Sequence, residues 1–166
     1  MAVSRAAGFL LLAASLALAQ NHWQLVWGDE FDGPGATGSW RLTPIRGGIL
    51  FLDGSGNLMI RAEKSEDGYT SARLHTQGKF EFTYGKVEAR IKEPFGQSIW
   101  PAFWMLGAGF GRVGWPACGE VDIMENIGRE PATIHGTVHG PGYSGAHGIG
   151  QPYDLPGGAR FADDFH

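Results

Sequence analysis

The stretch GEVDIMENIG, residues 119–128, contains three carboxylates, Glu120, Asp122 and Glu125. A helix would turn about 100° per residue and would point Glu120 and Asp122 to nearly opposite sides, and the flanking glycines also disfavour it. A regular strand would place Glu120 and Asp122 on one face and Glu125 on the other. A β-bulge at Ile123–Met124 adds the residue that returns Glu125 to the first face. The spacing therefore predicts a bulged strand with all three carboxylates on one side.

Three kinds of site fit such a row of acids. Two carboxyl groups about 5–5.5 Å apart are the geometry of a retaining glycosidase, with one as nucleophile and the other as acid and base. A third carboxylate between them would keep one neighbour protonated and orient the other, and Asp122 is placed for this. Oxygen ligands also suit calcium or magnesium. A solvated acidic strand face is the third interpretation.

Short strand patterns recur outside this stretch, while helical periodicity is scarce after the N-terminus. Gly is abundant, with 27 residues, and Gly- and Pro-rich turns separate the apolar runs. This pattern predicts an antiparallel β-sandwich or barrel without a visible domain boundary. We expect a hairpin around "GSG" (54–56) and a long Gly/Pro loop over 140–160. The expected strands are 24–31, 49–53, 57–64, 80–92, 98–106, 120–125 and 133–139.

Aromatic residues near the acids favour a sugar site. Trp100 and Trp104 are four residues apart and share a strand face, and Trp115 lies just before the acidic strand. Sugar rings stack on exposed aromatic faces, and the indole N–H adds a donor. The alternative for each tryptophan is a place in the core.

Polar residues on neighbouring segments are further candidates. His135 and His139 share a face of the next expected strand, where they could bind a metal or hydrogen-bond a sugar hydroxyl. Arg73 could support a carboxylate or a hydroxyl, or be merely exposed. Cys118, the only cysteine, is two residues from Glu120 and is either a nucleophile or a small apolar residue.

Charge and the N-terminus exclude other classes and predict export. The formal net charge is −4 and there is no run of Lys or Arg, which excludes the electrostatic footprint of a nucleic-acid-binding protein. Arg5 and the apolar run 6–19, ending in Ala-Leu-Ala, have the pattern of a secretory signal peptide, with a buried N-terminal helix as the alternative. We expect residues 1–19 to be removed, and the mature protein to be extracellular or periplasmic and not in a membrane.

The chain resembles glycoside hydrolase family 16, and within it the laminarinase-like endo-β-1,3-glucanases. The resemblance rests on E-x-D-x-x-E at 120–125, the longer, bulged form of the family signature. It extends in the family's order over most of the chain after residue 19. The matching segments are WGDEFDG (27–33), SARLHTQGKFEFTYGKVEARIK (71–92), WPAFWMLG (100–107), WPACGEVDIMENIG (115–128) and TVHGPGYSG (137–145).

The resemblance implies a concanavalin-like jelly roll, a two-sheet antiparallel β-sandwich with a concave cleft. It implies hydrolysis of internal β-1,3 bonds of β-glucans with retention, and a protein that is a monomer and requires no cofactor. Mixed-linkage β-1,3-1,4-glucan as the substrate, or glucan binding without catalysis, are the alternatives. By position, Glu120 matches the nucleophile, Asp122 the assisting aspartate and Glu125 the acid and base. Cleft positions match Arg73, Trp100, Trp104, Trp115 and His139.

Two further expectations follow from the resemblance. Many family members carry a structural calcium ion, and Glu30 lies in the stretch that contributes to it. Family domains are longer than this chain, so we expect residues 20–166 to be the N-terminal portion of a catalytic domain. The sandwich would then be incomplete at its C-terminus, and we do not expect these residues by themselves to be fully active.

Overall fold

The computed structural model describes residues 23–32, 40–45 and 49–166, with Pro44 and Ile45 described by their backbone alone. The signal peptide predicted for residues 1–19 lies outside the described residues. No helix among the described residues is long and apolar enough to span a bilayer.

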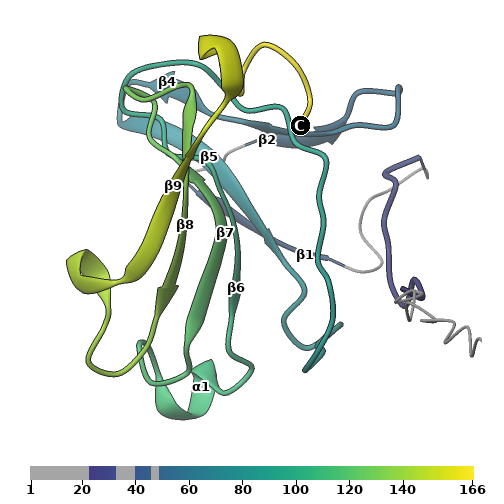
Figure 1. Cartoon of the computed structure of the whole chain (residues 1–166). Helices are drawn as coiled ribbons and strands as arrows, with labels where there is room; N and C mark the ends of the chain where they lie inside the picture. The colour runs from purple at the N-terminus through teal and green to yellow at the C-terminus, as the bar shows by residue number, and fades with distance from the viewer. Residues whose placement is uncertain (1–22, 33–39, 46–48) are drawn as a thin grey trace, which may run out of the picture.

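The larger sheet of the described chain is an antiparallel meander in the order β6-β7-β8-β9. Figure 1 shows β7 between β6 and β8, so its carboxylates have a neighbouring strand on each side. The short helix α1 (Phe110–Val113) lies in the β6–β7 connection, at one end of the sheet (Figure 1). The strands are β6 (Ala102–Leu106), β7 (Glu120–Asn126), β8 (Thr133–His139) and β9 (Ile149–Asp154).

The strands of the N-terminal half form two further antiparallel groups. One is ordered β1-β5-β4 and the other is the hairpin β2-β3, which also contacts β5. The all-β antiparallel sandwich predicted from the strand pattern is therefore confirmed. The strands are β1 (Arg41–Ile45), β2 (Ile49–Leu52), β3 (Leu58–Arg61), β4 (Glu63–Ser65) and β5 (Gly68–His75), and the remaining helices are the 3₁₀ turns η1 (Gly145–His147) and η2 (Pro156–Gly158).

The β2–β3 hairpin confirms the turn predicted at 54–56. The Asp53 carboxylate accepts hydrogen bonds from the backbone N–H groups of Ser55 (2.8 Å) and Asn57 (3.1 Å). Gly54 and Gly56 both have φ of +78°, a conformation that glycine adopts without steric cost. The strand expected over 57–64 is split, because β3 pairs with β2 whereas β4 pairs with β5.

Two predicted strands are wrong. Residues 24–31 make no ladder, and Trp27 instead stacks on Phe80 with ring centroids 5.2 Å apart. Residues 80–92 are not a strand either, and within them Ile91 alone exchanges a pair of backbone hydrogen bonds, both 2.9 Å, with His166. Alternation shows which side chains could be buried, but a strand also needs a neighbour for its N–H and C=O groups. Most of 80–92 has no such neighbour among the described residues.

The loop expected over 140–160 contains a strand, β9, which pairs with β8 along its whole length. Its sequence, IGQPYD, has no alternation because all six residues are exposed. Pro152 is tolerated because β9 is the edge strand of the sheet, where one side of the strand needs no hydrogen bonds.

Burial in the larger sheet is greatest along β7. Met124 is 8% exposed, Asp122 5% and Asn126 2%. The Asn126 side-chain amide donates to the backbone oxygens of Glu130 (3.1 Å) and Thr133 (2.8 Å), which fixes the turn from β7 to β8. The central strand therefore holds its acidic row on a firmly bonded backbone.

Candidate active site

The β-bulge in β7 is where the sequence predicts it. Along β6, Trp104 is opposite Asp122 while Phe103 is opposite Met124, so Ile123 is the additional residue. The register with β8 shifts in the same interval, between Asp122 and Glu125. Directly opposed residues project to the same face of an antiparallel pair. The shift therefore returns Glu125 to the face of Asp122, and the predicted row of carboxylates is confirmed.

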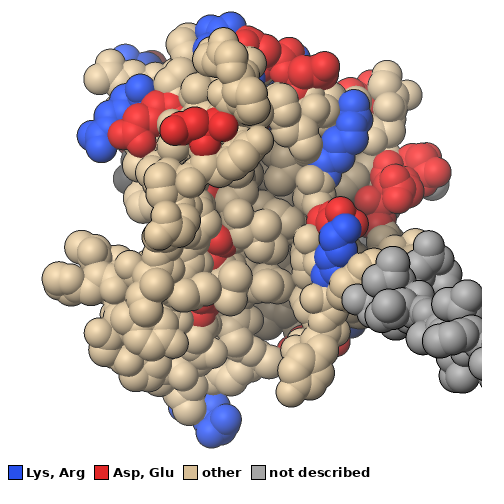
Figure 2. Space-filling view, viewed as in Figure 1, with Lys and Arg blue, Asp and Glu red and all other residues tan. Residues whose placement is uncertain are grey.

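The row of carboxylates lies in a cleft of the surface. Figure 2 shows acidic atoms in a line over β7, surrounded and partly covered by uncharged residues. Glu120 and Glu125 are partly exposed, whereas Asp122 between them is buried. The two outer carboxyl groups are thus accessible from solvent, whereas the middle one is not.

Each glutamate accepts a hydrogen bond from its own tryptophan. Trp100 Nε1 donates to Glu125 Oε1 at 3.0 Å, and Trp115 Nε1 donates to Glu120 Oε2. The Trp100 side chain is 70% exposed and that of Trp115 is 45% exposed. Both tryptophans therefore orient a carboxylate and still present ring surface at the rim of the row.

Asp122 is held by His139 from the adjacent strand. Its Oδ2 lies 3.1 Å from His139 Nε2, with the two side chains 4% and 12% exposed. Burial, followed by the negative charges of Glu120 and Glu125, raises the pKa of Asp122 to about 6, against a pull downward from His139. The proton on Asp122 is therefore retained at a pH where an exposed aspartate has lost it.

The second wall of the site comes from β5. The Arg73 guanidinium carbon stands 5.1 Å from the centroid of the Trp104 ring, and Trp104 is opposite Asp122 in the ladder. This contact joins the three-stranded sheet β1-β5-β4 to the face of β7 that carries the acids. Trp100, Trp115 and His139 thus contact the three carboxylates, and Trp104, with Arg73 over its ring, is opposite Asp122. That these five residues bind substrate stays a prediction.

Two other candidates lie apart from the row. His135 pairs with Glu130 instead, with Nε2 3.1 Å from Oε2. The Cys118 thiol donates to the Gly119 carbonyl oxygen at 3.4 Å and is held against no base by any contact of the described residues. The interpretation of Cys118 as a small part-buried residue agrees with this geometry.

The described residues contain no cluster of side chains that would hold a metal ion. In the described part of the chain, no three His, Cys, Asp or Glu side chains are grouped so that they could hold an ion. Glu30 is exposed. The part of Glu30 in a structural calcium site stays a prediction.

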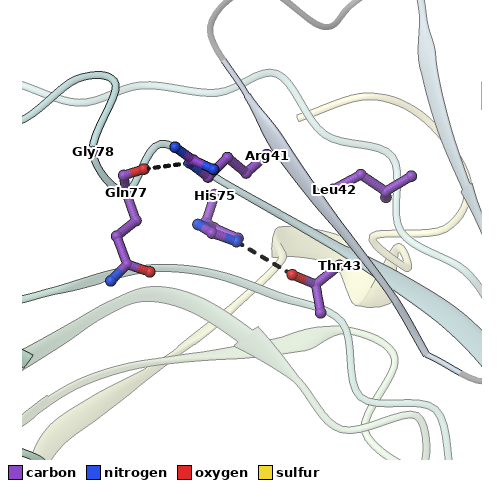
Figure 3. Close-up of a pocket in the computed structure, with 6 residues that line it drawn as sticks. All are labelled: Arg41, Leu42, Thr43, His75, Gln77 and Gly78. Atoms are coloured by element: carbon purple, nitrogen blue, oxygen red, sulfur yellow. Dashed lines mark hydrogen bonds between the residues drawn. The ribbon is translucent and has the colours of Figure 1, made fainter. Parts of the chain in front are cut away.

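Sequence reasoning missed one feature close to the row. A hollow over β1 and β5 has a volume of about 500 Å³, and Figure 3 shows the side chains that line it. Its lining depends on pairing β1 with β5, and no strand pattern in 41–45 signalled that pairing. The residues that line it are Arg41, Leu42, Thr43, His75, Gln77 and Gly78.

Comparisons with known proteins agree with this geometry. The model of the glycosyl hydrolases family 16 matches residues 45–166. The beta-glucanase of Rhodothermus marinus is 40% identical over 150 residues, which cover 74% of this chain and 50% of that protein. The glucan endo-1,3-beta-glucosidase of Cryptopygus antarcticus is 35% identical over 184 residues, which cover 95% of this chain and 66% of that protein.

A solved structure is similar over most of the chain. The catalytic domain of an endo-1,3-beta-glucanase (laminarinase) from Thermotoga petrophila RKU-1 is 46% identical with a TM-score of 0.78, covering 87% of this chain and 68% of that one. The chain spans between half and two thirds of the length of the two curated relatives above. The resemblance found in the sequence is confirmed, and the chain belongs to glycosyl hydrolase family 16.

Proposed function

We propose that the protein hydrolyses internal β-1,3-glucosidic bonds of β-glucans by a retaining double displacement. The observation that carries this proposal is the bulged strand, which puts two tryptophan-bonded glutamates on one face with a buried carboxyl group between them. The names of the relatives from Cryptopygus antarcticus and Thermotoga petrophila RKU-1 support the choice of linkage.

In the first step, the Glu120 carboxylate attacks the anomeric carbon and the bond to the leaving oxygen breaks. Glu125 gives its proton to that oxygen as the bond breaks. Trp100 occupies Oε1 of Glu125, so Oε2 is the atom that carries the proton. The products are a glycosyl ester on Glu120, a Glu125 carboxylate and a shortened glucan.

In the second step, water attacks the anomeric carbon of the ester. Glu125, now a carboxylate, takes a proton from the water, and Glu120 leaves with the electron pair of the ester bond. Two inversions restore the configuration of the sugar. Both glutamates return to their starting states without any further reactant.

Asp122 and His139 act on Glu120 in this scheme. In this scheme, the proton that Asp122 retains below a pH of about 6 forms a hydrogen bond to Glu120, whose negative charge is one of the causes that raise the pKa of Asp122. This bond fixes the orientation of the attacking carboxylate and stabilises its charge as it leaves in the second step. His139 holds Asp122 in place through its Oδ2 atom.

The rings and Arg73 supply the glucan contacts. Trp100 and Trp115 flank the acids at opposite ends, where sugar rings on either side of the cleaved bond would stack. These contacts do not distinguish β-1,3-glucan from mixed-linkage β-1,3-1,4-glucan, which stays the alternative substrate. Parallel assays on laminarin and on a mixed-linkage glucan separate the two.

Two single variants test the mechanism, Glu120→Ala and Glu125→Ala. With an activated aryl β-glucoside and azide, Glu120→Ala should give α-glucosyl azide, because azide replaces the nucleophile directly. Glu125→Ala should give β-glucosyl azide, because azide attacks the ester that still forms on Glu120. The anomers are distinguished by proton NMR.

Glu63→Ala is the matched control, since Glu63 is an exposed acid on β4 that pairs with Arg61 of β3. It should keep normal activity on laminarin. The mechanism is rejected if Glu120→Ala or Glu125→Ala keeps near-normal activity, or if both give the same anomer.

A non-catalytic glucan-binding protein is the second candidate. The 70% exposure of Trp100 and 45% exposure of Trp115 give a binding surface that needs no chemistry. A pull-down on insoluble β-1,3-glucan beside an assay for released reducing ends decides between the two, since binding without release would favour this candidate.

We also propose that the protein is exported after loss of residues 1–19 and acts as a monomer without a cofactor. N-terminal sequencing of the secreted protein and its elution volume in gel filtration test the first two points. Activity unchanged after dialysis against a chelator is expected for the third.

A further inference from the structure

The hollow over β1 and β5 is fixed by contacts between its own polar residues. Arg41 is opposite His75 in the ladder and Thr43 is opposite Arg73. His75 Nε2 lies 3.2 Å from Thr43 Oγ1, and Arg41 Nε donates to the Gln77 carbonyl oxygen at 2.9 Å, as the dashed lines in Figure 3 show. The cationic group and the ring are therefore held in position before any ligand arrives.

The hollow contains the guanidinium group of Arg41, and no carboxylate of the described residues pairs with it. None of its six lining residues is acidic, and in the described chain no carboxylate lies within ion-pair distance of Arg41 or His75. By contrast, Arg61 and Arg160 each pair with a carboxylate at the surface. The terminal nitrogens of Arg41 are thus left for a ligand, and a guanidinium matches the paired oxygens of a carboxylate or sulfate.

The lining also lacks the platform that a neutral sugar would use. No indole or phenyl ring is among the six residues, whereas Trp100, Trp104 and Trp115 surround the carboxylate row. Recognition in the hollow therefore depends on charge and hydrogen bonds rather than on stacking.

The hollow adjoins the cleft through Arg73. On β5, Arg73 is two residues from His75, about 6–7 Å along the strand, and both side chains are on the same face. Arg73 stands over Trp104, which is opposite Asp122. A glucan lying along the acids and over Trp104 thus reaches the hollow with its next units.

We propose that this hollow binds an acidic substituent, a carboxylate or a sulfate group, carried by the β-glucan chain in the cleft. This inference rests on the proposed function for the identity of the polysaccharide. It adds a preference that the carboxylate row does not provide, because three acids would repel an anionic chain that had no cation beside it.

Affinity electrophoresis of the whole chain tests the proposal. Native gels would contain neutral, carboxymethylated or sulfated β-1,3-glucan, with mobilities corrected by a gel without glucan. The net charge of −4 opposes general binding to a polyanion, so a preference for an acidic glucan reports a local site. We expect an acidic glucan to be bound about fivefold more tightly than the neutral one, as for one exposed charge pair.

The variants Arg41→Gln and Arg61→Gln remove the same charge from different places. Arg41→Gln should reduce binding of the acidic glucan to the level of the neutral one, with binding of neutral glucan unchanged. Arg61→Gln should keep the preference, because Arg61 pairs with Glu63 outside the hollow. A preference limited to the carboxylate or to the sulfate form supports the proposal and identifies the group.

Three results overturn the proposal. The first is binding of neutral glucan without any preference for the acidic forms, which leaves the proposed function intact. The second is an equal loss of preference in both variants. The third is an unchanged preference in Arg41→Gln. Absence of binding to every glucan would instead contradict the proposed function as well.

Discussion

The most unusual residue of the site is Asp122, a carboxyl group 5% exposed between two other acids. Its pKa of about 6 lies above the ordinary 3.8, so the folded state binds the proton more tightly than the unfolded state does. Such a group stabilises the fold while it is protonated, and this contribution is lost as the pH rises from about 4 through 6. The burial of Asp122 therefore lowers the stability of the fold above a pH of about 6, and below that pH it keeps a proton on Asp122 for the proposed mechanism.

Asp122→Asn should stabilise the protein at pH 8 and have little effect at pH 4. A shift of this size corresponds to at most about 3 kcal/mol, and we expect a gain of about 1–3 kcal/mol in the free energy of unfolding. Urea titrations of the wild type and the variant at both pH values measure it. The exposed Asp32→Asn is the isosteric control. An equal gain at both pH values, or none at pH 8, would contradict the ionisation argument.

The ionisation argument made for Asp122 also applies to Glu93, which is not one of the three carboxylates of the row. It is 6% exposed, burial raises its pKa to about 7, and its Oε2 has no hydrogen-bond partner in the described structure. Glu93→Gln should therefore raise the free energy of unfolding by about 1–3 kcal/mol at pH 8, with no gain at pH 4. Laminarin hydrolysis should be unchanged at pH 5. Glu81→Gln, at an exposed position, should change neither quantity.

At the scale of elements, the packing of β9 against β8 positions His139. A Cβ built on Gly148, the residue before β9, would lie 2.6 Å from His139 Nδ1, inside any normal contact distance. The Gly148 backbone, with φ of −56° and ψ of 151°, suits any residue, so the close approach of the His139 ring and of Thr137 Cγ2, which would be 2.7 Å from the Cβ, is what requires glycine. Gly148 thus leaves room for the ring that bonds Asp122.

Gly148→Ala should displace the His139 ring and weaken its contact with Asp122. We expect kcat on laminarin to fall by about tenfold, the equivalent of one hydrogen bond to a charged group, with KM little changed. Gly111→Ala, on α1 with open space around the new methyl group, is the control. Equal kinetics of the two variants would show that His139 does not position Asp122.

The elements also show where prediction from sequence succeeds. The bulge in β7 was predictable because strand periodicity is two, so a three-residue gap between acids on one face requires an extra residue. The hairpin at 54–56 was predictable from local turn chemistry. Strand β1 and the false strand at 80–92 depend on a partner distant in sequence, such as the β1–β5 pairing, and alternation carries no information about that partner.

The same distinction holds for the site. Glu120, Asp122 and Glu125 are close in sequence, and the tryptophans that bond to the glutamates lie within 25 positions of them. These could be predicted. The contact of His139 with Asp122 and the hydrogen bonds of His135 with Glu130 and of Arg41 with the Gln77 oxygen depend on strand register and could not.

For the whole molecule, the cleft is assembled from two sheets. The four-stranded sheet carries the acids on β7, and β5 of the three-stranded sheet β1-β5-β4 brings Arg73 over Trp104. The proposed catalysis therefore depends on how these two sheets pack as well as on the acidic strand. In the proposed mechanism, Glu120 of this assembly forms a covalent bond with the sugar.

Mass spectrometry of the protein after reaction with a 2-deoxy-2-fluoro-β-glucosyl fluoride, extended by β-1,3-linked glucose, tests this claim most directly. The fluorine at C2 slows both steps, whereas the reactive fluoride leaving group speeds only the formation of the ester, so the intermediate accumulates. We predict a mass increase of one glycosyl group, located by peptide mapping on Glu120 and absent from Glu120→Gln. An adduct on Asp122 or Glu125, or release of product with inverted configuration and no adduct, would contradict the account.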